Sequence, residues 1–274
     1  DLCVYHDDYG DYSTNEPPMA GTASLTYYLS SLSPEKKSGP AGNLMWDHGG
    51  IVRGDTSFRE IHLVFTGGEY NDGGDYIRKV LKKQDVRAHF FFTGDFYRNQ
   101  ENEQLIKQLR KDGNYLGAHS DKHLLYASWD NRDSLLIDQE TFNTDLINNY
   151  REMRRFGITK DDALLFLPPY EWYNKKISEW TRDLGLTLIN FTPGTRSNAD
   201  YTTPDMGNKY VSSEDIYQSI LDYENASAQG LNGFILLLHM GTHPGRTDKF
   251  YLKLNDLISE LKQQGYQFSL LSVK

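Results

Sequence analysis

The chain of 274 residues has very little cysteine and no long apolar run. Cys3 is the only cysteine, which excludes an internal disulfide framework and a cysteine-rich metal site. No stretch of about 18 apolar residues occurs, so the sequence predicts no membrane span. The 38 acidic residues outnumber the 29 basic ones, and the formal net charge is -9. This excess argues against a nucleic-acid partner, because phosphate binding needs a basic face. It suits a neutral or cationic partner.

The first fifth of the chain has no sustained hydrophobic period. Residues 1–55 are rich in Tyr, Asp, Ser, Gly and Pro, with one short strand candidate at 22–32. We predict an N-terminal arm over residues 1–55, packed on a main domain of residues 56–274. Because the first residue is Asp1 and not Met, we expect a processed or trimmed protein. Whether a signal or lipid anchor preceded residue 1 stays open.

From residue 61 onward, apolar runs alternate with amphipathic stretches whose apolar residues recur three and four apart. The predicted strands are 61–65, 87–92, 115–118, 163–167, 186–191, 234–239 and 267–272. The predicted helices cover 76–81, 105–109, 142–153 and 254–261. Strands that alternate with helices indicate a parallel sheet covered by helices. The fold class is therefore α/β, a distorted (β/α) barrel of about seven parallel strands.

Functional groups of a parallel barrel gather on the loops that follow the strands. In this chain those loops carry histidines and acids, at 66–72, 93–95, 119–123, 168–172, 192–201 and 239–243. Structural histidines scattered through a fold would not be expected to share one rim. The sequence therefore predicts a polar site at the carboxyl ends of the strands.

His119 and His123 are the most specific signal. Four residues apart in a helical turn, two imidazoles lie on one face and can bind one metal ion. The alternative is that His119 and His123 are two polar loop residues without a metal-binding role. His239 follows a buried run and is predicted at the rim, whereas His89 and His243 are predicted to be structural.

Four segments resemble the motifs of the polysaccharide deacetylase family, the NodB homology domain of carbohydrate esterase family four. HSDKH at 119–123 is similar to its metal-binding H-[ST]-x-x-H motif, and LLLH at 236–239 to its late leucine–histidine motif. LPPY at 167–170 is similar to R-x-P-Y, and LVFTGG at 63–68 to the early T-F-D-D-G motif. Order and spacing agree over about residues 56–274, which implies the barrel fold.

The resemblance implies a metal-dependent deacetylase. A divalent metal, zinc or else cobalt or nickel, is held by His119 and His123 and polarises the acyl carbonyl. His239 protonates the leaving amine, and the backbone amide of Tyr170 helps to stabilise the oxyanion.

The chain departs from the family at its acids. Thr66 and Gly67 stand where the family has its catalytic base and its third metal ligand, and Leu167 replaces the arginine of R-x-P-Y. The chain is also similar to a divergent branch with F-T-G-x-E and P-P-Y-E-W-Y-N. This similarity implies Glu69 as the third ligand and Glu171 as the base.

We therefore expect a hydrolase of a non-peptide carbon–nitrogen bond that removes N-acetyl or O-acetyl groups from a polysaccharide, with a glycan or amino-sugar substrate. Four residues are candidates for substrate binding: Trp172, Tyr201, Arg196 and Asp200. One alternative is a carbohydrate-binding pseudoenzyme, and another is a metal-free scaffold that holds a partner through the arm. The family implies an extracytoplasmic location. The oligomeric state stays open.

Overall fold

A computed structural model describes residues 43–273 of the chain. The strand predicted at 22–32 and most of the predicted arm lie outside the described residues.

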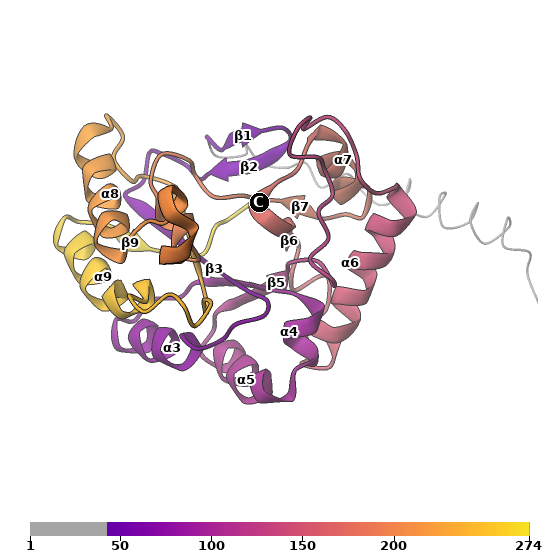
Figure 1. Ribbon diagram of the computed structural model, residues 1–274, viewed down its shortest axis with the longest axis horizontal. Helices are drawn as coiled ribbons and strands as arrows, with labels where there is room; N and C mark the ends of the chain where they lie inside the picture. Colours follow the sequence, from indigo (N-terminus) through magenta and orange to yellow (C-terminus); the bar gives the residue numbers. More distant parts are fainter. Residues whose placement is uncertain (1–42, 274) are drawn as a thin grey trace, which may run out of the picture. The chain divides into compact units, whose positions relative to one another are not determined.

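One sheet of nine strands organises these residues (Figure 1), in the order β1-β2-β8-β3-β4-β5-β6-β7, with β9 paired to β3. Neighbours from β8 to β7 run parallel, whereas β1 with β2 and β2 with β8 run antiparallel. The strands are β1 (Met45–Asp47), β2 (Gly50–Arg53), β3 (Glu60–Gly67), β4 (His89–Phe92), β5 (Tyr115–Ala118), β6 (Leu165–Phe166), β7 (Thr187–Leu188), β8 (Phe234–His239) and β9 (Gln267–Phe268). Each strand predicted from residue 61 onward is present, and the predicted distorted (β/α) barrel is confirmed.

Helices surround the sheet (Figure 1): α3 (Gly74–Lys83), α4 (Gly94–Arg98), α5 (Glu103–Lys111), α6 (Gln139–Arg154), α7 (Lys175–Asp183), α8 (Ser213–Ala226) and α9 (Leu254–Gln263). Short 3₁₀ turns add η1 (Gln100–Asn102), η2 (Pro169–Glu171), η3 (Ser197–Ala199), η4 (Pro204–Lys209) and η5 (Phe250–Lys253). The Ser212 hydroxyl caps α8 by accepting from the Asp215 N–H at 3.1 Å. No helix within residues 43–273 is apolar over a length that would cross a membrane.

The β2 strand joins the two sides of the curled sheet. It pairs with β8, and its Ile51 also bridges to Ile189, just beyond β7. The Asn190 N–H donates to the Ile51 carbonyl at 2.8 Å. This strand therefore lies between β8 and the end of β7 and connects them. It belongs to the stretch that the sequence assigns to the arm.

Two apolar clusters fill the fold because strand side chains alternate between the two faces. The larger cluster packs the helices against the sheet. The smaller cluster consists of Ile51, Val64, Phe91, Leu165, Leu167, Ile189, Ile235, Leu237 and Leu271. Two residues beyond Val64, Phe91 and Leu237 stand Thr66, Thr93 and His239. The strand period therefore directs polar side chains to the carboxyl end of this inner cluster.

Candidate active site

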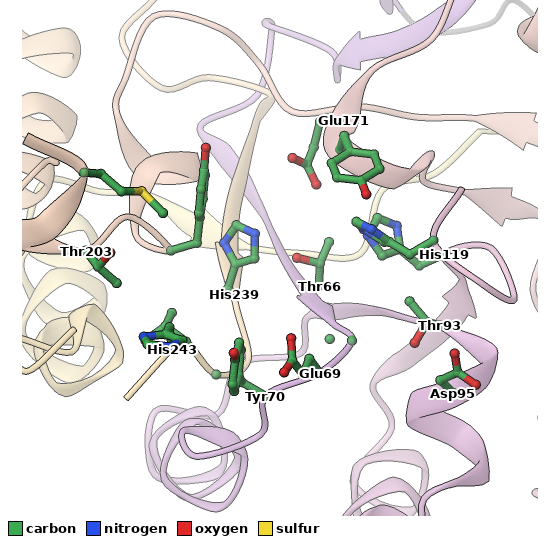
Figure 2. A pocket seen from close by; sticks show the side chains of 18 of the residues that line it. Thr66, Glu69, Tyr70, Thr93, Asp95, His119, Glu171, Thr203, His239 and His243 are labelled. Atoms are coloured by element: carbon green, nitrogen blue, oxygen red, sulfur yellow. The ribbon is translucent and has the colours of Figure 1, made fainter. Parts of the chain in front are cut away.

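A cavity of about 970 Å³ opens at the carboxyl ends of the parallel strands (Figure 2). Its lining comes from the segments that follow β3, β4, β5, β6 and β8, joined by the segment around η4. The lining residues include Thr66, Glu69, Tyr70, Thr93, Asp95, His119, His123, Trp129, Tyr170, Glu171, Tyr201, Thr203, Asp205, Met206, His239 and His243. The polar rim that the sequence predicts is therefore a single cavity.

His119 and His123 come together at this cavity. Their ring centroids are 5.0 Å apart, edge to face. The Nδ1 of His119 lies 2.8 Å from the Leu167 carbonyl. A carbonyl only accepts hydrogen bonds, so Nδ1 carries the proton and the lone pair belongs to Nε2. Metal-binding histidines are commonly oriented in this way.

The loop that carries the two histidines is not helical, and the predicted helical turn is wrong. Ser120 and His123 have φ values of 71° and 54°, in the left-handed region. Such backbone is unfavourable for residues other than glycine and persists only where neighbours hold it. The spacing of four residues is compatible with either geometry, so the pairing was predictable but the backbone was not.

The α6 helix holds this loop through a buried carboxylate, Asp145. Its two oxygens accept from the backbone N–H groups of Asp121 and Lys122, both at 3.1 Å, and from the Tyr126 hydroxyl at 2.7 Å. One turn later, the side-chain oxygen of Asn149 accepts from the His119 N–H at 2.9 Å. Two residues on one face of α6 therefore fix the backbone on which both imidazoles are mounted.

Both imidazoles are neutral at physiological pH. Burial, and then the neighbouring His123, lowers the pKa of His119 well below its ordinary value. Burial also lowers the pKa of His123 to about 4, with a further lowering by His239. A neutral imidazole is the form that binds a metal ion.

The pair fits a divalent cation by its chemistry, but the third protein ligand is not assembled. Within residues 43–273, no group of three His, Cys, Asp or Glu side chains is arranged to hold a metal ion. Glu69 lines the same cavity, is exposed and faces the Tyr70 hydroxyl. Thr66 is buried, and its hydroxyl has no hydrogen-bond partner among the described residues. An unsatisfied buried hydroxyl is costly, which points to a ligand or water at this position.

Gly67, which the sequence analysis compares with the second aspartate of the early deacetylase motif, has no room for a side chain. A Cβ built there would lie 2.7 Å from the Phe92 ring and 3.0 Å from Phe96. These rings stack on each other at 4.1 Å. The packed rings of Phe92 and Phe96 therefore occupy the space that an aspartate side chain at position 67 would need.

His239 is fixed by Asp200, a buried residue. The Asp200 carboxylate accepts from the His239 backbone N–H at 2.9 Å and lies 2.5 Å from its Nδ1. Burial opposes the charge on the ring, but Asp200 outweighs it, and Glu171 adds to the effect, so the pKa of His239 is raised. Because Nδ1 is engaged, Nε2 is the nitrogen that can exchange a proton with a bound molecule.

Glu171 points into the space between His239 and His119 (Figure 2). Both Tyr170 and Glu171 have left-handed backbone, with φ values of 59° and 52°, and the Glu171 carbonyl accepts from the Asn190 side chain at 2.7 Å. Burial raises the pKa of Glu171 to about 7, with His239 lowering it and Asp200 raising it. A carboxylate with a pKa near 7 is suited to proton transfer.

The other predicted residues divide between cavity and surroundings. Tyr201 lines the cavity, with its ring 5.4 Å from that of His239, and Asp200 acts behind His239. Trp172 is not among the lining residues, and its indole N–H donates to the Ser128 carbonyl at 3.1 Å. Arg196 is exposed and also outside the lining.

Two further histidines have contrasting positions. His89 is buried, with Nδ1 3.2 Å from the Leu63 carbonyl, so its predicted structural role is confirmed. His243 lines the cavity, edge to face with Tyr70 at 5.8 Å. Sequence reasoning also missed the lining residues Thr203, Asp205 and Met206. They do not directly follow a strand, so the strand-end rule gave no signal for them.

Comparison with known proteins agrees with this architecture. The polysaccharide deacetylase family model matches residues 53–189. The chain is 28% identical over 217 residues to the peptidoglycan-N-acetylmuramic acid deacetylase PdaA of Bacillus subtilis, covering 78% of this chain and 71% of that protein. It is 25% identical over 208 residues to a peptidoglycan-N-acetylglucosamine deacetylase of Bacillus cereus, covering 74% and 84%.

Solved structures show the same fold. The structure of Bacillus subtilis PdaA, a family 4 carbohydrate esterase, matches with a TM-score of 0.63 at 24% identity, covering 81% of this chain and 83% of that one. A wild-type pseudoenzyme of the same esterase family from Bacillus anthracis matches with a TM-score of 0.59 at 19% identity, covering 81% and 67%. From the family match together with the shared fold, we conclude that this chain belongs to the polysaccharide deacetylase family.

Proposed function

We propose that this protein is a metal-dependent deacetylase that hydrolyses the acetamide of an N-acetylated glycan, and that it also accepts O-acetyl esters. The observation that carries the proposal is the convergence in one cavity of a neutral histidine pair, a carboxylate with a pKa of about 7 and an Asp-bound histidine. The two peptidoglycan deacetylases named above support an amino-sugar polymer as the substrate class. They also support an extracytoplasmic location.

The chain's own residues account for the proton transfers. His119 and His123 would hold the metal, with Glu69 as a third ligand once its exposed side chain turns toward them. When bound, a divalent metal supplies polarisation of the acyl carbonyl and activation of water. Glu171 takes the proton of the attacking water.

The remaining steps release the products. The Tyr170 backbone amide stabilises the charge that develops on the acyl oxygen. His239, oriented by Asp200, gives a proton to the departing sugar nitrogen as its bond to the acyl carbon breaks. Water and the acetamide thus become acetate and a free sugar amine.

Elemental analysis for metal tests this proposal first. The purified protein should contain close to one equivalent of zinc, cobalt or nickel, and the double variant His119→Ala/His123→Ala should contain none. His48→Asn is a matched control, because His48 lies outside the cavity lining and asparagine tolerates its positive φ. Absence of metal from the wild-type protein, even after reconstitution, would contradict the proposal.

The second candidate function is carbohydrate binding without turnover. The residues at the usual acid positions favour it: Thr66 has an unpartnered hydroxyl, and Gly67 is closed off by aromatic rings. Acetate release from N-acetylglucosamine oligomers by the metal-loaded protein excludes this candidate. Binding of the same oligomers with no acetate release under zinc, cobalt or nickel supports it.

A further inference from the structure

A small hairpin over residues 126–136 lies between β5 and α6; we call it the Trp129 hairpin. An antiparallel bridge joins Ala127 to Leu135. The Ser128 N–H donates to the Ser134 carbonyl at 2.9 Å, and the Leu136 N–H donates to the Tyr126 carbonyl at 2.9 Å. Trp129 lies near its turn and lines the cavity.

Three hydrogen bonds attach this hairpin to the segment just before α7, toward which it runs in Figure 1. The Arg132 guanidinium donates to the Tyr173 carbonyl at 2.6 Å, and the Asn174 amide donates to the Arg132 carbonyl at 2.8 Å. The Trp172 indole N–H donates to the Ser128 carbonyl at 3.1 Å. The segment before α7 therefore holds the Trp129 hairpin at Arg132, near its turn, and at Ser128, in its first strand.

The Trp129 ring is supported from behind and open in front. The Trp129 ring stacks on that of Trp172, with ring centroids 5.3 Å apart and an angle of 29° between the rings. The Arg132 guanidinium lies 4.6 Å from the centroid of the Trp172 ring. Nevertheless 57% of the Trp129 surface is exposed. A single exposed aromatic residue is ordinary. An indole already held in place, however, loses little conformational entropy when it binds a flat apolar surface.

The position of Trp129 relates it to the histidine pair. Its ring centroid is 5.9 Å from that of Tyr170, which in turn is 4.4 Å from that of His123. Tyr201 and Met206 are also exposed and line the same cavity. The cavity therefore continues from the reacting centre along aromatic side chains.

We propose that Trp129 is a stacking platform for the sugar ring next to the one that is deacetylated, so that the protein selects glycan chains over monosaccharides. This inference rests on the proposed function, because it identifies the occupant of the cavity as a glycan. The apolar face of a pyranose ring matches the exposed indole, and its hydroxyl groups remain in water.

Tryptophan NMR tests the platform separately from catalysis. The chain has four tryptophans, so its indole N–H spectrum should contain four signals. In the Glu171→Gln background, which keeps substrate intact, an N-acetylglucosamine tetramer should shift the Trp129 signal and bind more tightly than the monomer. Trp129→Ala should weaken tetramer binding by about ten- to hundredfold, as truncation of a buried aromatic contact does, and Trp129→Phe should retain most of it.

Trp46→Ala is the matched control, because Trp46 is 54% exposed but does not line the cavity. Equal affinity for monomer and tetramer, or unchanged tetramer binding in Trp129→Ala, would overturn the proposal. So would a Trp129 signal that shifts with protein concentration and not with sugar, because the platform would then contact a second copy. Trp129-dependent binding without acetate release would support the platform and contradict only the hydrolase. Acetate release that depends neither on Trp129 nor on chain length would support the hydrolase and contradict the platform.

Discussion

Two groups of polar side chains in the cavity differ in how firmly they are held. In the histidine group, His119 is bound through its ring and its backbone, and His239 is bound twice by Asp200. In the β3 group, Glu69 is exposed and the Thr66 hydroxyl has no partner among the described residues. His119 and His239 are therefore fixed before any ligand binds, whereas the position of Glu69 depends on what binds. The histidines match the motifs of the polysaccharide deacetylase family, whereas Thr66, Gly67 and also Leu167 depart from them.

The largest expected effect tests whether Glu171, an acid outside the β3 group, acts as the base. Glu171→Gln keeps the size of the side chain but removes its ability to accept a proton. Acetate release should fall by about 10²–10⁴-fold, as on loss of a positioned base, while the metal content stays unchanged. Rates measured on metal-loaded protein check this. Full activity in this variant would remove Glu171 from the mechanism and return attention to Glu69.

A smaller effect is expected when the support of the loop that carries His119 and His123 is removed. In the wild type, the two Asp145 oxygens accept hydrogen bonds from the backbone N–H groups of Asp121 and Lys122. In Asp145→Asn, an NH₂ group replaces one of these oxygens and cannot accept, so the loop loses at least one of its hydrogen bonds. Metal affinity should fall by about 10–100-fold, as for other outer partners of metal ligands. Competition with a chelator measures it. Glu140→Gln, exposed on the same helix, should bind metal like the wild type, and an unchanged affinity in Asp145→Asn would show that the loop holds itself.

The smallest effect is a shift in pH dependence. His239 must be protonated to donate, so activity falls as the pH rises through its pKa. Asp200 raises that pKa, so in Asp200→Asn the alkaline fall should move to lower pH. A profile of kcat/KM against pH reports it, with Asp205→Asn, an exposed carboxylate of the same cavity, as the comparison. An alkaline limb that stays in place in Asp200→Asn would assign it to another group.

Long-range order in this fold could be predicted from the sequence, but local geometry could not. The seven parallel strands have apolar runs long enough to recognise, and the rule that loops follow strand ends placed His119, Glu171 and His239 in one cavity. Within β1 and β2 no more than two apolar residues stand in a row, so no apolar run marks these strands. The β1 strand pairs with β2, and β2 pairs with β8, a partner distant in the sequence.

The details of the site depended on side-chain packing that spacing does not encode. The sequence selected Trp172 for substrate binding, yet Trp172 supports the ring of Trp129, and only Trp129 lines the cavity. Both lie in rim loops, and only the stacking order distinguishes them. Similarly, HSDKH suits a helical turn or a left-handed loop, and contacts from α6 determine which one forms.

The rings that cover Gly67 make the chain's divergence hard to reverse. Position 66 already carries a β-carbon, so an aspartate there asks only for a change of chemistry. At position 67, the side chain of an aspartate would clash with the rings of Phe92 and Phe96, so these two residues would have to move or be replaced. Two replacements that stand side by side in the sequence are thus unequal evolutionary steps. An aspartate at position 66 would keep the surrounding packing, whereas an aspartate at position 67 would need Phe92 and Phe96 to change as well.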